Sequence, residues 1–67
     1  MQKEEIKEML SSVISQQIEV KAKLRMISYL MNAGKYVYHN QIDELLDKFT
    51  YLNKLEIELR KKLDEIK

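Results

Sequence analysis

The sequence predicts an all-α fold, an antiparallel hairpin of two helices, from three observations. Apolar residues recur at spacings of three and four in both halves of the chain, proline is absent, and the single glycine lies near the middle. Such spacing places side chains along one seam of a helix. The intervening residues are mostly good helix formers, and no period-two alternation of comparable length favours strands.

The first helix is expected over about residues 3–32. Its seam is interrupted only by Gln17 and consists of Ile6, Leu10, Val13, Gln17, Val20, Leu24, Ile27 and Met31. The stretch Asn32-Ala33-Gly34-Lys35 predicts the end of this helix, because glycine can adopt the left-handed conformation found there. We therefore expect a tight turn over about residues 33–36.

The second helix is expected over about residues 37–66, with Tyr36 already helical. Its seam is interrupted only by Glu56 and consists of Tyr38, Ile42, Leu45, Phe49, Leu52, Glu56, Leu59, Leu63 and Ile66. Acid-to-base pairs four residues apart, such as Glu56 with Arg60, add about 0.2–0.5 kcal/mol each. In the alternative, Asn40 caps the helix with Asp43 three residues later, and residues 32–39 form a longer connection.

Gln17 and Glu56 are the two polar residues in the seams, and an antiparallel arrangement brings them into neighbouring layers. Polar groups in a helical seam cost stability unless they are paired, and their best-attested use is to fix register or oligomer state. We interpret Gln17 and Glu56 as a specificity layer. Partial exposure at the edge of a bundle and a ligand-binding Glu at its centre are the alternatives.

The small size of the chain favours self-association. A domain of 67 residues buries only about 60% of its unfolded surface, and the lack of Cys together with a single His excludes disulfides and Cys- or paired-His zinc sites. Apolar residues outside the seams would otherwise lie exposed. We expect a homodimer that forms a four-helix bundle, or a helical protein partner, with an interface made by Ile14, Ile18, Met26, Tyr29, Leu55 and Ile57.

Charge and hydropathy argue against a polyanion and against a membrane as partners. Twelve basic and eleven acidic residues give a net charge of +1. The first five residues are polar, unlike a signal peptide, and the apolar-rich stretch at residues 26–31 is too short to cross a bilayer. We expect a soluble cytoplasmic protein without cofactors or metals, and the Lys-, Ile- and Glu-rich composition suggests a bacterial or phage source.

Two groups of residues are candidates for chemistry. Asp43 and Asp47 share one helix face with Glu44 adjacent, a pattern that suits a hard cation or acid–base catalysis. Acidic side chains near a helix start are also favourable when simply solvated, and no Glu-x-x-His pattern accompanies them. His39 is the only histidine and so the only candidate for proton transfer of that type, but it stands beside the turn without a neighbouring nucleophile motif. We expect no catalytic site here.

A basic and aromatic cluster is compatible with RNA binding. The cluster combines four basic residues with three tyrosines, namely Lys21, Lys23, Arg25 and Lys35 with Tyr29, Tyr36 and Tyr38. Basic and aromatic side chains together are typical of nucleic-acid surfaces. Glu19 and Asp43 are interspersed among them, so nucleic-acid binding is the less favoured interpretation.

The segment His39-Asn40-Gln41-Ile42-Asp43-Glu44-Leu45-Leu46 resembles the Ser-Gln-x-Leu-Asp-x-Leu-Ile motif of the small sporulation-control aspartyl-phosphate phosphatases. The resemblance implies a helical hairpin in which Asp43 acts in the dephosphorylation of a response regulator. His39 and Asn40 stand where that family has Ser and Gln.

The combined prediction is a small non-enzymatic regulatory or protein–protein interaction module that acts through a helical face. Phosphatase activity towards a response regulator is the first alternative, and an RNA-binding hairpin dimer is the second.

Overall fold

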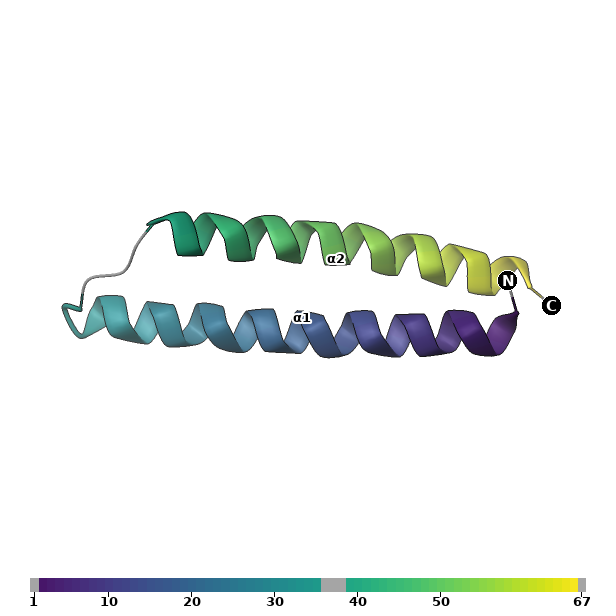
Figure 1. Cartoon of the computed structure of the whole chain (residues 1–67), viewed down its shortest axis with the longest axis horizontal. Helices are drawn as coiled ribbons and strands as arrows, with labels where there is room; N and C mark the ends of the chain where they lie inside the picture. Colours follow the sequence, from purple (N-terminus) through teal and green to yellow (C-terminus); the bar gives the residue numbers. More distant parts are fainter. Residues whose placement is uncertain (1, 36–38, 67) are drawn as a thin grey trace.

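The computed structural model describes residues 2–35 and 39–66, and it shows two helices packed against each other as a hairpin (Figure 1). Helix α1 spans Lys3–Asn32 and helix α2 spans His39–Glu65. They run in opposite directions, so both ends of the chain lie at one end of the hairpin and the connection lies at the other. The described residues contain no strand, which confirms the predicted all-helical hairpin.

Helix α1 ends in a left-handed glycine, as the sequence predicts. Gly34 has φ +77°. The amide of Lys35 donates to the carbonyl of Leu30 at 2.9 Å, and the amide of Gly34 donates to the carbonyl of Met31 at 3.1 Å. This pair of bonds is the Schellman motif, which satisfies carbonyls that have no partner within the helix.

Helix α2 begins at His39, so Asn40 lies inside the helix and is not its N-cap. The expectation that Tyr36 is already helical and that Tyr38 joins the seam falls outside the described residues.

The core follows the two predicted seams. The buried residues are Ile6, Leu10, Val13, Gln17 and Val20 on α1 with Leu52 and Leu59 on α2. Half-buried apolar side chains pack against them, namely Ile14, Leu24, Leu45, Phe49, Leu55, Leu63 and Ile66. Each seam therefore covers the other, as the heptad spacing requires.

Packing is tighter near the chain ends than near the connection. No described residue between Lys21 and Tyr51 is buried, and the seam residue Met31 is 50% exposed. Figure 1 shows the two ribbons lying farther apart at the connection. None of the described helical stretches is long and apolar enough to cross a membrane.

Candidate interaction site

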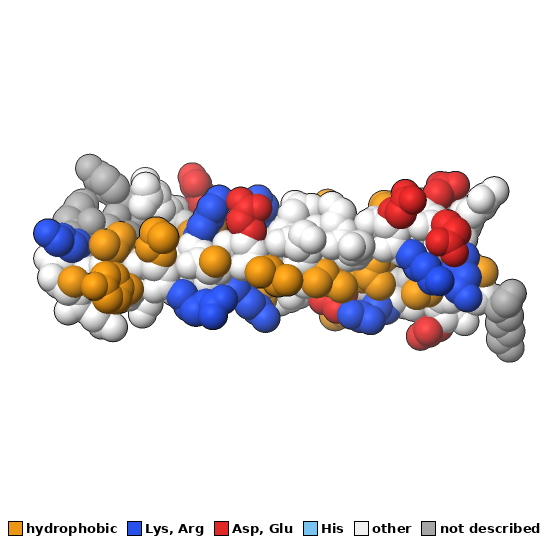
Figure 2. Space-filling view, turned by 90° about the horizontal axis from the view of Figure 1, so that it is seen from below, with side chains coloured by type: hydrophobic (Ala, Val, Ile, Leu, Met, Phe, Trp, Pro, Cys, Tyr) orange, Lys and Arg blue, Asp and Glu red, His pale blue; other side chains and the backbone are white. Residues whose placement is uncertain are grey.

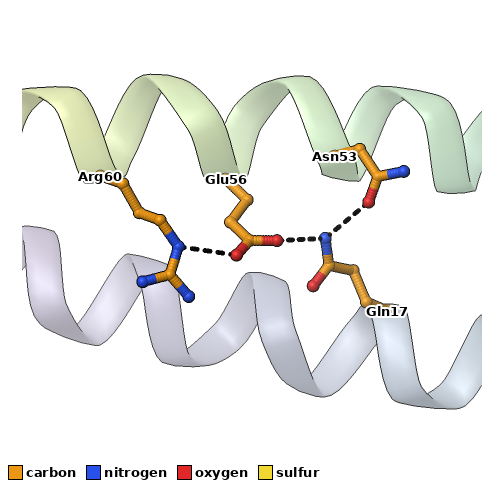
Figure 3. Close-up of polar contacts among 4 residues, drawn as sticks. All are labelled: Gln17, Asn53, Glu56 and Arg60. Carbon is orange, nitrogen blue, oxygen red and sulfur yellow. Dashed lines mark hydrogen bonds and ion pairs between the residues drawn. The ribbon is translucent and has the colours of Figure 1, made fainter.

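A polar layer crosses the middle of the hairpin (Figure 3). The side-chain amide nitrogen of Gln17 donates to Asn53 Oδ1 at 3.0 Å and to Glu56 Oε1 at 2.9 Å. The second carboxylate oxygen of Glu56 accepts a bond of 2.7 Å from Arg60 Nε. Spacings of three and four residues place all three α2 side chains on one flank of that helix. Gln17 and Glu56 thus lie in direct contact, as the antiparallel register predicts.

The hydrogen bonds of this layer offset the desolvation of Gln17, which is only 8% exposed. No buried side-chain nitrogen or oxygen atom among the described residues lacks a partner. The bond from Gln17 and, next, the bond from Arg60 hold the pKa of Glu56 below its ordinary value, because both stabilise the carboxylate. The layer is therefore a satisfied polar network and not an unpaired charge in the core.

The sequence interpretation missed the part that Asn53 plays in this layer. Asn53 lies outside the heptad seam, so periodicity gave it no special weight. Its position three residues before Glu56 is the available signal, because side chains at that spacing are neighbours on a helix surface.

An apolar stripe runs along the side of α1 that faces away from α2 (Figure 2). The exposed fractions are 60% for Ile18, 65% for Met26 and 72% for Tyr29. Together with the small residue Ala22 they follow a spacing of four, four and three, which keeps them on one surface of the helix. Figure 2 shows hydrophobic side chains continuing along most of this face, with charged side chains on either side of them. We call the surface of Ile18, Ala22, Met26 and Tyr29 the outward stripe.

The six residues expected to form an interface do not share one surface. Ile14 and Leu55 are half-buried and pack against the core of the hairpin itself. Ile57 is 67% exposed but belongs to α2. Ile18, Met26 and Tyr29 remain as members of the outward stripe.

A groove opens between the helices near the connection, and the sequence gave no indication of it. Its volume is about 460 Å³. Apolar side chains and charged or polar side chains line it, namely Met26, Ile27, Leu30 and Leu45 with Lys23, Gln41, Glu44 and Lys48. It lies where the seam residues are only half-buried.

The candidates for chemistry lie in open positions. His39, Asp43, Glu44 and Asp47 are all exposed. Within residues 2–35 and 39–66, no three His, Cys, Asp or Glu side chains are grouped so that they could hold a metal ion.

The basic cluster is partly engaged within the hairpin. Lys23 Nζ lies 3.2 Å from Glu19 Oε1, and Lys21 Nζ lies 5.6 Å from the centroid of the Phe49 ring, within the range of a cation–π contact. Arg25 and Tyr29 are exposed. Tyr36 and Tyr38, the other aromatic members of the expected RNA-binding cluster, lie outside the described residues.

Comparisons of the chain with protein-family models, curated proteins and solved structures found no match. The geometry of the surfaces described above is therefore the basis for assigning a function.

Proposed function

We propose that this chain is a small, non-enzymatic cytoplasmic interaction module that acts through the outward stripe of α1. In this proposal two hairpins associate through their α1 helices into an assembly of four helices and present a helical surface to regulate a partner protein. The observation that carries the proposal is the exposure of Ile18, Met26 and Tyr29, each 60% exposed or more, on one face of one helix. Contiguous apolar surface of this kind is a mark of protein–protein contact.

The free energy gained by burying the outward stripe is comparable with the free-energy cost of association. Burying a large apolar side chain completely is worth about 1.5–3 kcal/mol, so the three largely exposed side chains of each copy contribute on the order of 1–2 kcal/mol apiece. Six such side chains in a dimer supply about 6–12 kcal/mol, which is of the same order as the association cost of about 4–15 kcal/mol.

Analytical ultracentrifugation tests the proposal. The wild-type chain should sediment at micromolar concentration with twice the monomer mass of 8.1 kDa. Ile18→Lys should sediment as the monomer, because it places a charge within the outward stripe. Tyr51→Lys is the matched control, since Tyr51 is a large side chain, 63% exposed, on α2. A wild-type monomer, or equal dissociation by both variants, contradicts the proposal.

Phosphatase activity is a second candidate, and one observation favours it. Asp43 is exposed on α2, so its carboxylate is accessible to a partner protein. In this reading Asp43→Asn abolishes dephosphorylation of a cognate response regulator while circular dichroism shows unchanged helicity. Asp47→Asn is the control. Unchanged activity of Asp43→Asn would remove Asp43 from the mechanism.

A further inference from the structure

We infer that the groove between α1 and α2 near the connection binds a small amphiphile, an alkyl chain that ends in a carboxylate. This inference goes beyond the proposed function, because the groove lies between the helices of one hairpin and requires no second copy. Three features carry it: the apolar lining of the groove, its length, and the two lysines at one end.

Most of the lining of the groove is apolar. Ile27 and Leu30 of α1 and Leu45 of α2 are half-buried, and Met26 lines the groove while remaining 65% exposed. The groove volume of about 460 Å³ is within the range of about 300–1,000 Å³ for small-molecule sites, which combine apolar walls with a few charged groups. An alkyl chain in the groove would cover apolar surface that the two helices leave in contact with water.

Lys23 and Lys48 both line the groove and lie at the same level of the hairpin, one on each helix. The polar layer joins Gln17 to residues 53–56 and so fixes which parts of the two antiparallel helices are level. Counting along both helices from that layer places Lys23 level with residues 47–50. The two lysines therefore stand together at the end of the groove that is nearer to the middle of the rod.

The groove extends from this pair of lysines towards the connection. Leu30, which lines it farther along α1, lies seven residues after Lys23. At a rise of about 1.5 Å per residue, this separation is about 10 Å along the helix axis. The extended chain of octanoate is of about this length.

The charges at the lysine end favour a carboxylate. Two ammonium groups at one level repel each other, and a carboxylate between them would accept a charge-assisted hydrogen bond from each. Lys23 Nζ lies 3.2 Å from Glu19 Oε1, but this pair is exposed and therefore weak. Within the described part of the chain, no carboxylate forms an ion pair with Lys48.

Glu44 gives the ligand one orientation. It lines the groove one helical turn nearer to the connection than Lys48 does. The negative charge of Glu44 repels a carboxylate on the connection side, whereas the two lysines attract it at the opposite end. The carboxylate of the ligand therefore lies between the lysines, and its alkyl chain lies towards Leu30.

Titration with three ligands of equal chain length tests the site. Octanoate, octanol and octylammonium carry the same alkyl chain with a negative, a neutral and a positive end. In amide NMR spectra of the wild-type chain, octanoate should shift the signals of residues that line the groove. It should bind at least about threefold more tightly than octanol, because two exposed ion pairs add to the apolar contact, and octylammonium should bind most weakly.

Variants separate recognition of the charge from burial of the alkyl chain. Lys23→Gln combined with Lys48→Gln should reduce the affinity for octanoate to that for octanol. Lys3→Gln combined with Lys54→Gln is the matched control, since it removes one exposed lysine from each helix outside the groove. Leu30→Gln should weaken the binding of all three ligands.

Three outcomes overturn the inference. Octanoate may leave the groove signals unshifted while it shifts those of the outward stripe, or it may bind no more tightly than octanol. Equal loss of octanoate affinity in the two double-lysine variants would indicate attraction to the net charge of the chain and not to the groove. None of these outcomes bears on the proposed self-association, which sedimentation tests separately.

Discussion

Gln17 shows how one side chain can define the register of a helical hairpin. Its amide reaches two acceptors on α2, Asn53 and Glu56. A shift of the register by two layers would separate Gln17 from Glu56, so both polar groups would face apolar side chains. Since a buried polar group without a partner is strongly unfavourable, this layer disfavours shifted pairings.

Replacing Gln17 alone should destabilise the hairpin more than replacing Gln17 and Glu56 together. Gln17→Leu leaves Asn53 and Glu56 without their donor, and we expect a fall in Tm of the order of 5 °C. Gln17→Leu combined with Glu56→Leu should raise Tm above that of the wild type while loosening the choice of oligomer state. Thermal unfolding followed by circular dichroism and sedimentation of both variants measures the two effects. A double variant less stable than Gln17→Leu contradicts the prediction.

Glu56 should make the stability of the hairpin sensitive to acid. Its pKa in the folded chain lies below the ordinary value of 4.5, so the unfolded chain binds more protons between the two values. The stabilisation is therefore complete above about pH 5 and is lost as the pH falls through the folded pKa. Urea unfolding between about pH 3 and about pH 7 should show a smaller acid-induced loss of unfolding free energy for Glu56→Gln than for the wild type. Glu58→Gln, an exposed carboxylate on the same helix, is the control.

At the scale of elements, the end of α1 depends on one backbone conformation. An added Cβ at Gly34 would meet no atom within 4 Å, so a substitution there changes backbone energy and not packing. Gly34→Ala should reduce the free energy of unfolding by about 1–2 kcal/mol, the penalty of a left-handed conformation. Gly34→Asn should lose less, because Asn tolerates this conformation better. Equal stability of Gly34→Ala and wild type in urea unfolding would contradict this account.

The periodicity of the sequence predicted the helices and the face that each one buries, because heptad spacing alone determines which side chains share a seam. It did not predict how closely the seams approach. Met31 is half exposed and Ile14 and Leu55 are half-buried, since coverage depends on the distance between the helices at each level. The periodicity did not predict Asn53 or the groove for the same reason. Both lie on the flanks of the seam, where the spacing of apolar residues says little about which side chains are in contact.

The whole molecule is a narrow rod of 52 × 15 × 13 Å. A single layer of two helices has little interior, so apolar side chains such as Tyr29 and Ile57 remain on its surface, 72% and 67% exposed. Small domains of this kind commonly gain stability from association.

Stability should accordingly depend on protein concentration. If association accompanies folding, each tenfold rise in concentration adds about 1.4 kcal/mol per dimer, or about 5 °C in Tm. Ile18→Lys should show a lower Tm that is independent of concentration. Calorimetry over a hundredfold range of concentration makes the comparison. A wild-type Tm that does not change with concentration would contradict the coupling of association to folding.

Both ends of the chain lie at the same end of the rod, opposite the connection (Figure 1). A fluorescent protein fused to either terminus would thus leave the hairpin at one pole and keep the connection unobstructed. Two domains attached to the two termini would lie beside each other at that pole, while the connection would stand at the far end of a rod 52 Å long. The hairpin would then act as a stalk that holds its connection away from whatever is attached to its ends.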